Sequence, residues 1–188
     1  MNINREEIVE LTTTHGKDWG INHVRRLLAL IDVIGEDQDY DKDVIWVATH
    51  LHDWGAYGEW KQSGVDHVER SLQVAGDYMK EQGYPEDFFD HVMECIGTHH
   101  SGDPNRSIEA ILLSDADALD FLGVIGVLRI FSKTPRELRK AYEDIKRRKE
   151  KLLASGIVLK RSKEIAAERA KQMEWLFETL EENSAGHF

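Results

Sequence analysis

Histidine and aspartate recur at four places in apolar helical segments where core residues would otherwise be expected. The residues are His23, the pair His52 and Asp53, the pair His99 and His100, and the cluster Asp115, Asp117 and Asp120. A buried ionised carboxylate costs several kcal/mol unless it is paired with a cation or bound to a metal. Neutral imidazoles with carboxylates suit Mn, Fe, Zn, Ni or Co, with Mg less favoured. The pattern therefore predicts divalent metal binding, although a single buried histidine is more often an ordinary core residue.

Helical periodicity runs through almost the whole chain and must position these residues. The predicted helices are Asn4 to Gly16, about 19–34, 41–52, 63–83, 85–100, 107–123, about 135–154 and about 162–182. There is no alternating strand pattern, and the chain has only three prolines. The sequence therefore predicts an all-α fold that ends in two long amphipathic helices.

The helix that leads into "HLHDWG" separates its two histidines. Val44, Ala48, Leu51 and His52 share one face, whereas His50 points elsewhere, near Trp46 and Val47. The spacing predicts that His52 rather than His50 is buried, and that His50 is not a ligand.

Composition is typical of one globular domain. The 188 residues are 41% hydrophobic, and the formal net charge is −11, which argues against a nucleic-acid binder. Residues 129–163 nevertheless hold 13 Lys and Arg against 4 Asp and Glu. This basic segment is interpreted as a solvated helix face, with a phosphate-facing patch as the alternative.

The sequence also predicts a cytoplasmic protein. Its only cysteine, Cys95, lies among apolar residues, as expected for a buried, unreactive thiol. The first ten residues, MNINREEIVE, show no signal-peptide pattern, and no apolar run reaches the 18 residues typical of a membrane span. A homo-oligomer is left open.

The order His23, His52-Asp53, Asp117 resembles the HD-domain superfamily of metal-dependent phosphohydrolases. The flanks "NHVRRL", "HLHDWG" and "LLSDADALDFLGVIGVLRIF" are similar too, and "KEIAAERAKQMEWLFETLEE" resembles the closing helix of the bacterial subgroup that includes small nucleotide pyrophosphatases. The resemblance implies a single HD-domain helical bundle over residues 1–188, with a core at about 18–130 and a C-terminal helical extension at about 131–183.

The resemblance implies that His23, His52, Asp53 and Asp117 hold one divalent ion. Helical periodicity alone favours Asp115 over Asp117, but a helix that is apolar all round gives little facial information. Asp53, Asp117 and Asp120 are the candidate catalytic residues; Asp120 has the alternative of a supporting or ordinary polar residue.

In two-metal members of the superfamily, further histidines hold a second ion. His67, His99 and His100 stand in the matching order, although "THHS" would also suit the end of a helix, where histidine favours the dipole. No Gly-Tyr-Pro motif of cyclic-dinucleotide phosphodiesterases follows His99 and His100. One ion is expected, and a second is left open.

The reaction implied is hydrolysis of a nucleotide or related phosphate ester by metal-activated water. Candidate substrate-binding cations are Arg26, Lys61 and Arg129, each with the alternative of a surface charge. The aromatic residues Trp54, Tyr57 and Trp60 are candidate pocket walls or core residues. Two other functions stay open: a di-iron HD-type oxygenase and a non-catalytic, metal-stabilised binding module.

Overall fold

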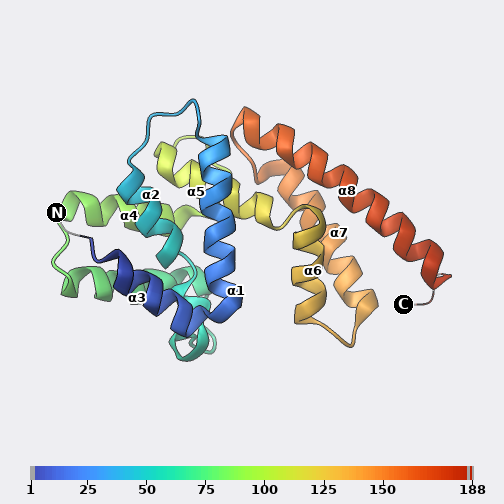
Figure 1. Ribbon diagram of the computed structural model, residues 1–188, viewed down its shortest axis with the longest axis horizontal. Helices are drawn as coiled ribbons and strands as arrows, with labels where there is room; N and C mark the ends of the chain where they lie inside the picture. Colours follow the sequence, from blue (N-terminus) through green and yellow to red (C-terminus); the bar gives the residue numbers. More distant parts are fainter. Residues whose placement is uncertain (1–2, 186, 188) are drawn as a thin grey trace. The chain divides into compact units, whose positions relative to one another are not determined.

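The computed structural model describes residues 3–185 and residue 187. In this part of the chain there are eight α-helices, two short 3-10 helices and no strand, which confirms the all-α prediction (Figure 1). The chain divides into two compact units, Met1–Ser114 and Asp115–Phe188. A single HD domain with a core at about 18–130 stays a prediction.

The elements follow the predicted order. They are α1 (Arg5–Ile34), α2 (Lys42–Leu51), η1 (Trp54–Ala56), η2 (Gly58–Trp60), α3 (His67–Glu81), α4 (Glu86–Thr98), α5 (Ile108–Asp120), α6 (Gly123–Lys133), α7 (Leu138–Ser155) and α8 (Lys160–Ser184). The boundary between the two units falls within α5. Among the described residues, no helix is both long enough and apolar enough to cross a membrane.

Side-chain caps begin three helices of the first unit. Asn4 accepts a hydrogen bond from the Glu7 amide at the start of α1, and Asp41 accepts from the amides of residues 43 and 44 at the start of α2. Asp66 accepts from the Val68 amide, so that α3 begins at His67. Each cap satisfies amides that have no partner within the helix.

Helix α1 contains the two helices that the sequence predicts, joined at a kink. Lys17 has φ 51° and ψ −160°, outside the helical region, so the helical conformation breaks directly after Gly16. A positive φ is costly for a residue with a β-carbon. The prediction of two helices is thus correct in backbone conformation, although they form one element without an intervening loop.

The core of the first unit holds the helices that carry histidine. Helix α2 packs against α1 and α4, and α3 packs against η1 and α4. Apolar side chains of α1 and α2 fill this core: Val24, Leu27, Ile31, Val44, Ala48 and Leu51. Burying a side chain as large as Leu contributes about 1.5–3 kcal/mol, so the packing fixes how α1 and α2 present their polar residues.

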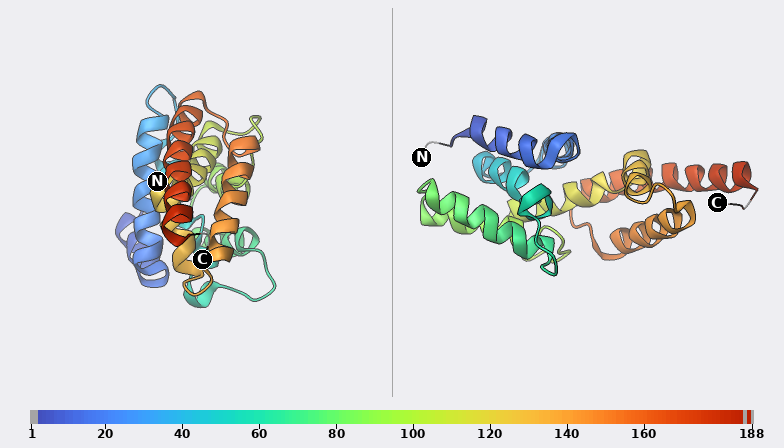
Figure 2. Two further views of the ribbon diagram at one scale, coloured as in Figure 1. Left: turned by 90° about the vertical axis from the view of Figure 1, so that its right-hand side faces the viewer. Right: turned by 90° about the horizontal axis from the view of Figure 1, so that it is seen from below.

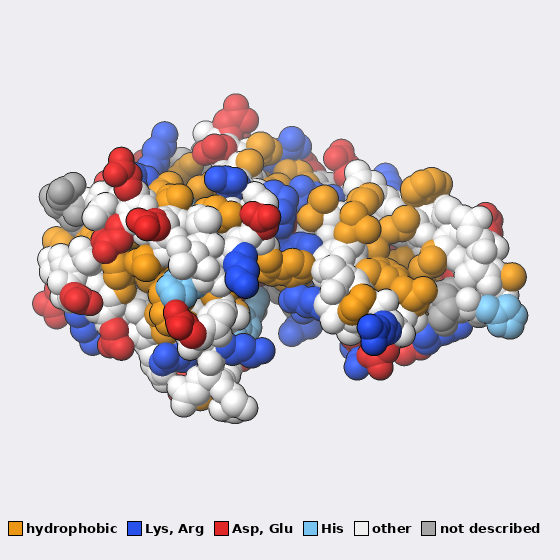
Figure 3. Space-filling model, turned by 60° about the horizontal axis from the view of Figure 1, so that its bottom comes forward, with side chains coloured by type: hydrophobic (Ala, Val, Ile, Leu, Met, Phe, Trp, Pro, Cys, Tyr) orange, Lys and Arg blue, Asp and Glu red, His pale blue; other side chains and the backbone are white. Residues whose placement is uncertain are grey.

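In the second unit, α6 packs against both α7 and α8 (Figures 1 and 2). The Asp115 carboxylate accepts hydrogen bonds from the backbone amides of Val158 and Leu159, each at 2.8 Å, and so anchors the start of α8. The segment "GVIG" opens α6, where Gly123 has φ +77°. In Figure 3, hydrophobic side chains gather on the surface of the helices after α5. The exposed apolar residues of α6 include Val124 and Leu128.

Candidate metal centre

Three predicted ligands of the first unit come together. His23 lies on α1, His52 caps the C-terminus of α2, and Asp53 follows directly. Asp53 Oδ2 lies 3.8 Å from His23 Nε2 and 3.6 Å from His52 Nε2, and one ligand atom from each residue lies within 4.8 Å of the others. Both imidazoles are buried, and the Asp53 side chain is 20% exposed. We call this set the first cluster.

The hydrogen bonds of His52 leave a nitrogen lone pair for the first cluster. Its Nδ1 lies 2.8 Å from the Thr49 carbonyl oxygen. Because a carbonyl only accepts, Nδ1 carries the hydrogen, and in the neutral ring Nε2 then holds the lone pair. A metal-binding histidine is commonly oriented by such a backbone bond. The donor set therefore fits a divalent transition ion.

The segment after Asp53 is locked in place by close contacts. The Gly55 amide donates to Ser71 Oγ at 3.0 Å, and a β-carbon at Gly55 would lie only 2.3 Å from the Ser71 nitrogen. The Trp54 indole donates to Thr12 Oγ1 at 3.0 Å. The glycine of "HLHDWG" thus allows the chain to approach the α3 backbone, which fixes Asp53 from its C-terminal side.

His67, His99 and His100 form a second cluster, with one ligand atom of each within 4.8 Å of the others. His67 Nε2 lies 3.0 Å from His100 Nε2, and the His99 and His100 ring centroids lie 4.0 Å apart. The His99 Nδ1 donates to the Ile96 carbonyl at 2.6 Å, which leaves its Nε2 with the lone pair. The structure therefore brings together the three histidines predicted for a second ion.

The two clusters are neighbours within the first unit. The ring centroids of His52 and His99, one from each cluster, lie 5.1 Å apart in an edge-on arrangement. Both rings are buried, and each has its Nδ1 bound to a carbonyl of its own helix. The arrangement is compatible with one ion or two.

Arg106 braces the loop that carries His99 and His100. Its guanidinium donates to the carbonyl oxygens of Thr98, Ser101 and Asp103, each at 2.7 Å. Hydrogen bonds from a charged donor are worth about 1.5–3 kcal/mol. The sequence alone does not reveal this role, because an arginine directly before Ser107 carries no pattern that distinguishes it from a surface charge.

The predicted aspartates of α5 lie in the second unit. Asp115 is committed to the backbone at the start of α8, which removes the periodicity argument for it as a ligand. Asp117 is buried on α5, and its part in binding metal stays a prediction.

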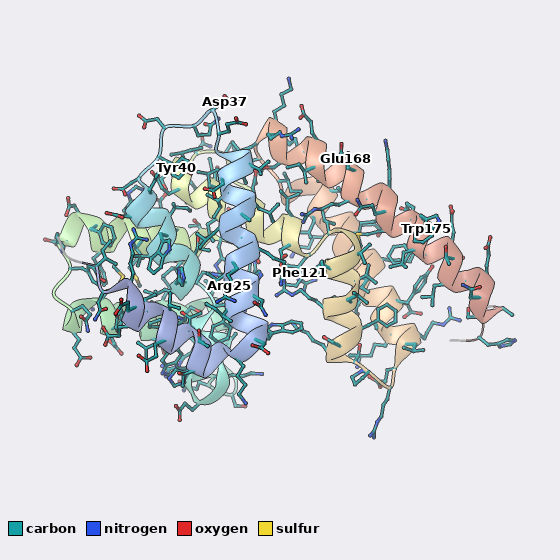
Figure 4. All side chains as sticks on the ribbon, in the orientation of Figure 1. Arg25, Asp37, Tyr40, Phe121, Glu168 and Trp175 are labelled. Carbon is teal, nitrogen blue, oxygen red and sulfur yellow. The ribbon has the colours of Figure 1, made fainter. Side chains whose placement is uncertain are left out.

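Asp120 and Arg129 form a buried ion pair with each other. The Arg129 guanidinium also lies 4.4 Å from the centroid of the Phe121 ring, which is labelled in Figure 4. The pairing favours a structural role. A catalytic Asp120 and a substrate-binding Arg129 stay untested predictions.

The other two candidate cations lie in the first unit. Arg26 is half-buried on α1, one turn after His23, and Lys61 is exposed directly after η2. Both stay candidates for binding phosphate.

The interpretation of the aromatic residues as pocket walls is wrong for Trp54 and Tyr57. Both are buried: Trp54 stacks on Trp60 at 4.7 Å between ring centroids, and Tyr57 lies against the α1 backbone. A β-carbon at Gly16 or Gly20 would come within 2.8 Å of the Tyr57 ring. These rings therefore belong to the core, as the alternative interpretation held.

The expectation for His50 needs one correction. His50 is buried as well as His52, because its ring packs on Trp46 at 3.8 Å and its Nδ1 lies 2.8 Å from the Trp46 carbonyl oxygen. Burial lowers the pKa of His50 to about 4. It lies outside both clusters, as expected for a residue that is not a ligand. Cys95 is buried as predicted, and burial raises the pKa of its thiol.

Comparison with known proteins decides the family. The sequence model of the HD domain matches residues 20–122, which is more than half of the chain. The chain belongs to the HD domain family. Among curated proteins, no sequence matches it.

Solved structures of similar proteins show the same fold across nearly the whole chain. Bacillus subtilis YpgQ in complex with ADP has a TM-score of 0.70 and 22% identity, covering 95% of this chain and 92% of that chain. An HD-superfamily hydrolase from Bacillus thuringiensis has a TM-score of 0.67 and 23% identity, covering 96% of each chain. A predicted HD superfamily hydrolase from an uncultured Thermotogales bacterium has a TM-score of 0.64 and 21% identity, covering 96% and 91%.

Proposed function

We propose that this protein is a metal-dependent phosphohydrolase that acts on a nucleotide or a related phosphate ester or anhydride. The observation that carries the proposal is the first cluster, in which ligand atoms of His23, His52 and Asp53 lie within 4.8 Å of one another in a member of the HD domain family. Similar structures include two HD-superfamily hydrolases and YpgQ with ADP, which supports a phosphate-containing substrate.

The ligand chemistry of the first cluster favours catalysis over a purely structural site. His23, His52 and Asp53 would hold a divalent ion, with Asp117 as the predicted fourth ligand. When bound, such an ion polarises a phosphoryl oxygen and brings the pKa of a bound water toward neutrality. Structural zinc sites are usually closed to solvent, whereas the Asp53 carboxylate of the first cluster keeps contact with solvent.

The side chains around the cluster have separate roles in this proposal. Asp53 orients a water through the carboxylate edge that reaches solvent. Arg26, one turn beyond His23, supplies a fixed positive charge for the phosphate, which a guanidinium can bind through two hydrogen bonds. His67, His99 and His100 would hold a second ion, which would supply further positive charge for the phosphate.

A nucleotide panel with added Mn, Co, Ni or Mg tests the proposal. Metal-loaded protein should release phosphate or pyrophosphate from at least one nucleotide, and chelation should stop the release. Oxygen consumption that depends on iron, without phosphate release, would support the oxygenase alternative. Tight metal binding with neither reaction would support a binding module, and either result would overturn the proposal.

A further inference from the structure

We propose that Trp19 is the specificity-determining residue of this site and that its indole stacks on the base of a nucleotide whose phosphates reach the metal cluster. The inference rests on the proposed function, because it assigns the part of the substrate that does not react. Trp19 lies on α1 in the same regular helical stretch as His23, after the break at Lys17.

Helix geometry places Trp19 on the face of α1 that carries the metal ligand. Residues four apart, such as Trp19 and His23, and residues three apart, such as His23 and Arg26, are neighbours on one side of a helix. His23 is buried and its Nε2 faces Asp53, so this side of the helix is the one directed at the cluster. An aromatic ring and a guanidinium therefore flank the metal ligand, one turn away on either side.

The spacing along the helix matches the parts of a nucleotide. At about 1.5 Å per residue, Trp19 lies roughly 6 Å from His23 along the helix axis, and Arg26 lies roughly 4.5 Å beyond. The indole would stack on the base of a nucleotide, and the metal ion and the guanidinium would bind its phosphates. Neither a simple phosphate monoester nor inorganic pyrophosphate has a group for the indole.

Trp19 is also accessible enough to take a ligand. Its side chain is 38% exposed. By contrast, Trp54, which directly follows the proposed ligands His52 and Asp53 in sequence, is only 1% exposed and packs in the core. The turn of α1 that carries Trp19 is held firmly, because Tyr57 packs against Gly16 and Gly20 on an adjacent side of the same helix. A rigid turn with an accessible ring is what a stacking platform needs, since little conformational entropy is then lost on binding.

Two non-hydrolysable probes that differ only in the nucleoside test this inference. Binding of α,β-methylene-ADP and of methylenediphosphonate to the metal-loaded full-length protein would be measured by calorimetry. Trp19→Ala should weaken α,β-methylene-ADP about tenfold or more, as expected for loss of one stacking contact. The same substitution should change the affinity for methylenediphosphonate by no more than about twofold. Trp19→Leu, which keeps an apolar side chain but has no ring face, should behave like Trp19→Ala, and Trp19→Phe should keep most of the affinity.

Matched variants control for indirect effects. Trp175, labelled on α8 in Figure 4, is 63% exposed, and Trp175→Ala should change neither affinity. Arg26→Ala should weaken both probes alike. Equal weakening of both probes by Trp19→Ala, no change in α,β-methylene-ADP binding, or equal affinity of the parent protein for both probes would overturn the inference. Failure of the proposed function would be seen separately, as absence of turnover with the selective loss in binding still present.

Discussion

The two histidine clusters of the first unit differ in charge and in exposure. The first contains a carboxylate and two buried imidazoles, whereas the second consists of three imidazoles, of which His67 and His100 reach the surface. A carboxylate compensates part of the charge of a divalent ion, and burial strengthens that attraction. This difference predicts that the first cluster holds its ion through purification and that the second cluster exchanges its ion readily.

The segments that carry the two clusters explain why they differ in burial. His52 and Asp53 follow a buried helix whose next turn is locked by Gly55 and Trp54. His99 and His100 follow α4, in a loop whose carbonyl oxygens accept hydrogen bonds from the Arg106 guanidinium. Core packing thus fixes the first cluster, whereas two of the three histidines of the second cluster, His67 and His100, reach the surface.

The largest expected effect is that of Asp53→Ala. Removing the only carboxylate of the first cluster should lower phosphate release by more than about a hundredfold, because loss of one transition-state interaction already costs that much. Metal content by elemental analysis should fall with it. Asp90→Ala, an exposed change on α4, serves as the control. Circular dichroism should show retained helix in both variants. Full activity of Asp53→Ala would contradict the proposal that the first cluster holds the ion needed for phosphate release.

The neighbouring histidines of "HLHDWG" should separate metal binding from stability. His52→Ala should lose the ion of the first cluster. His50→Ala should keep it but unfold at a lower temperature, because it removes a buried ring packed on Trp46. Metal analysis and thermal unfolding of both variants check this. Equal metal loss in the two variants would show that His50 belongs to the first cluster.

Arg106→Ala should weaken the second cluster without touching a ligand. Loss of the three carbonyl contacts should loosen the loop of His99 and His100 and lower affinity for the second ion by about 10–100-fold. Competition with a metal-sensitive dye would give the affinities. The first cluster should be unaffected, and an equal loss at both would mean that the clusters act as one site.

The smallest effect is expected for Cys95→Ala. Cys95 lies one turn before His99 on α4, yet its thiol is buried and burial raises its pKa, so it stays protonated at pH values where an exposed cysteine forms thiolate. Native protein at pH 8 should therefore resist iodoacetamide, and the variant should bind metal as the parent does. Rapid alkylation, or loss of the second ion, would place the thiol in the second cluster.

Local patterns predicted the helices and failed where distant contacts decide. Asn4, Asp41 and Ser107 begin three of the predicted helical ranges, and the side chain of each accepts a backbone hydrogen bond at the start of its helix. Burial of His50 depends on Trp46 and on the surrounding helices, which a single helical face does not reveal.

Asp115 shows a second kind of failure. Periodicity favours it as a ligand because it lies on an apolar stripe, but its partners are amides more than 40 residues away in sequence. The resemblance to HD domains selected Asp117 instead, and no property of α5 alone could have done so.

The contact of Tyr57 with Gly16 and Gly20 has a consequence for mutational tolerance. Alanine usually stabilises a helix relative to glycine by about 1 kcal/mol, but here the added methyl group would meet the phenol ring at both positions. In a scan of all single substitutions, two glycines without any reactive group would then rank among the intolerant positions, next to true ligands. Epistasis tells them apart: a smaller side chain at position 57 should rescue alanine at position 20, whereas no second change should rescue the loss of Asp53.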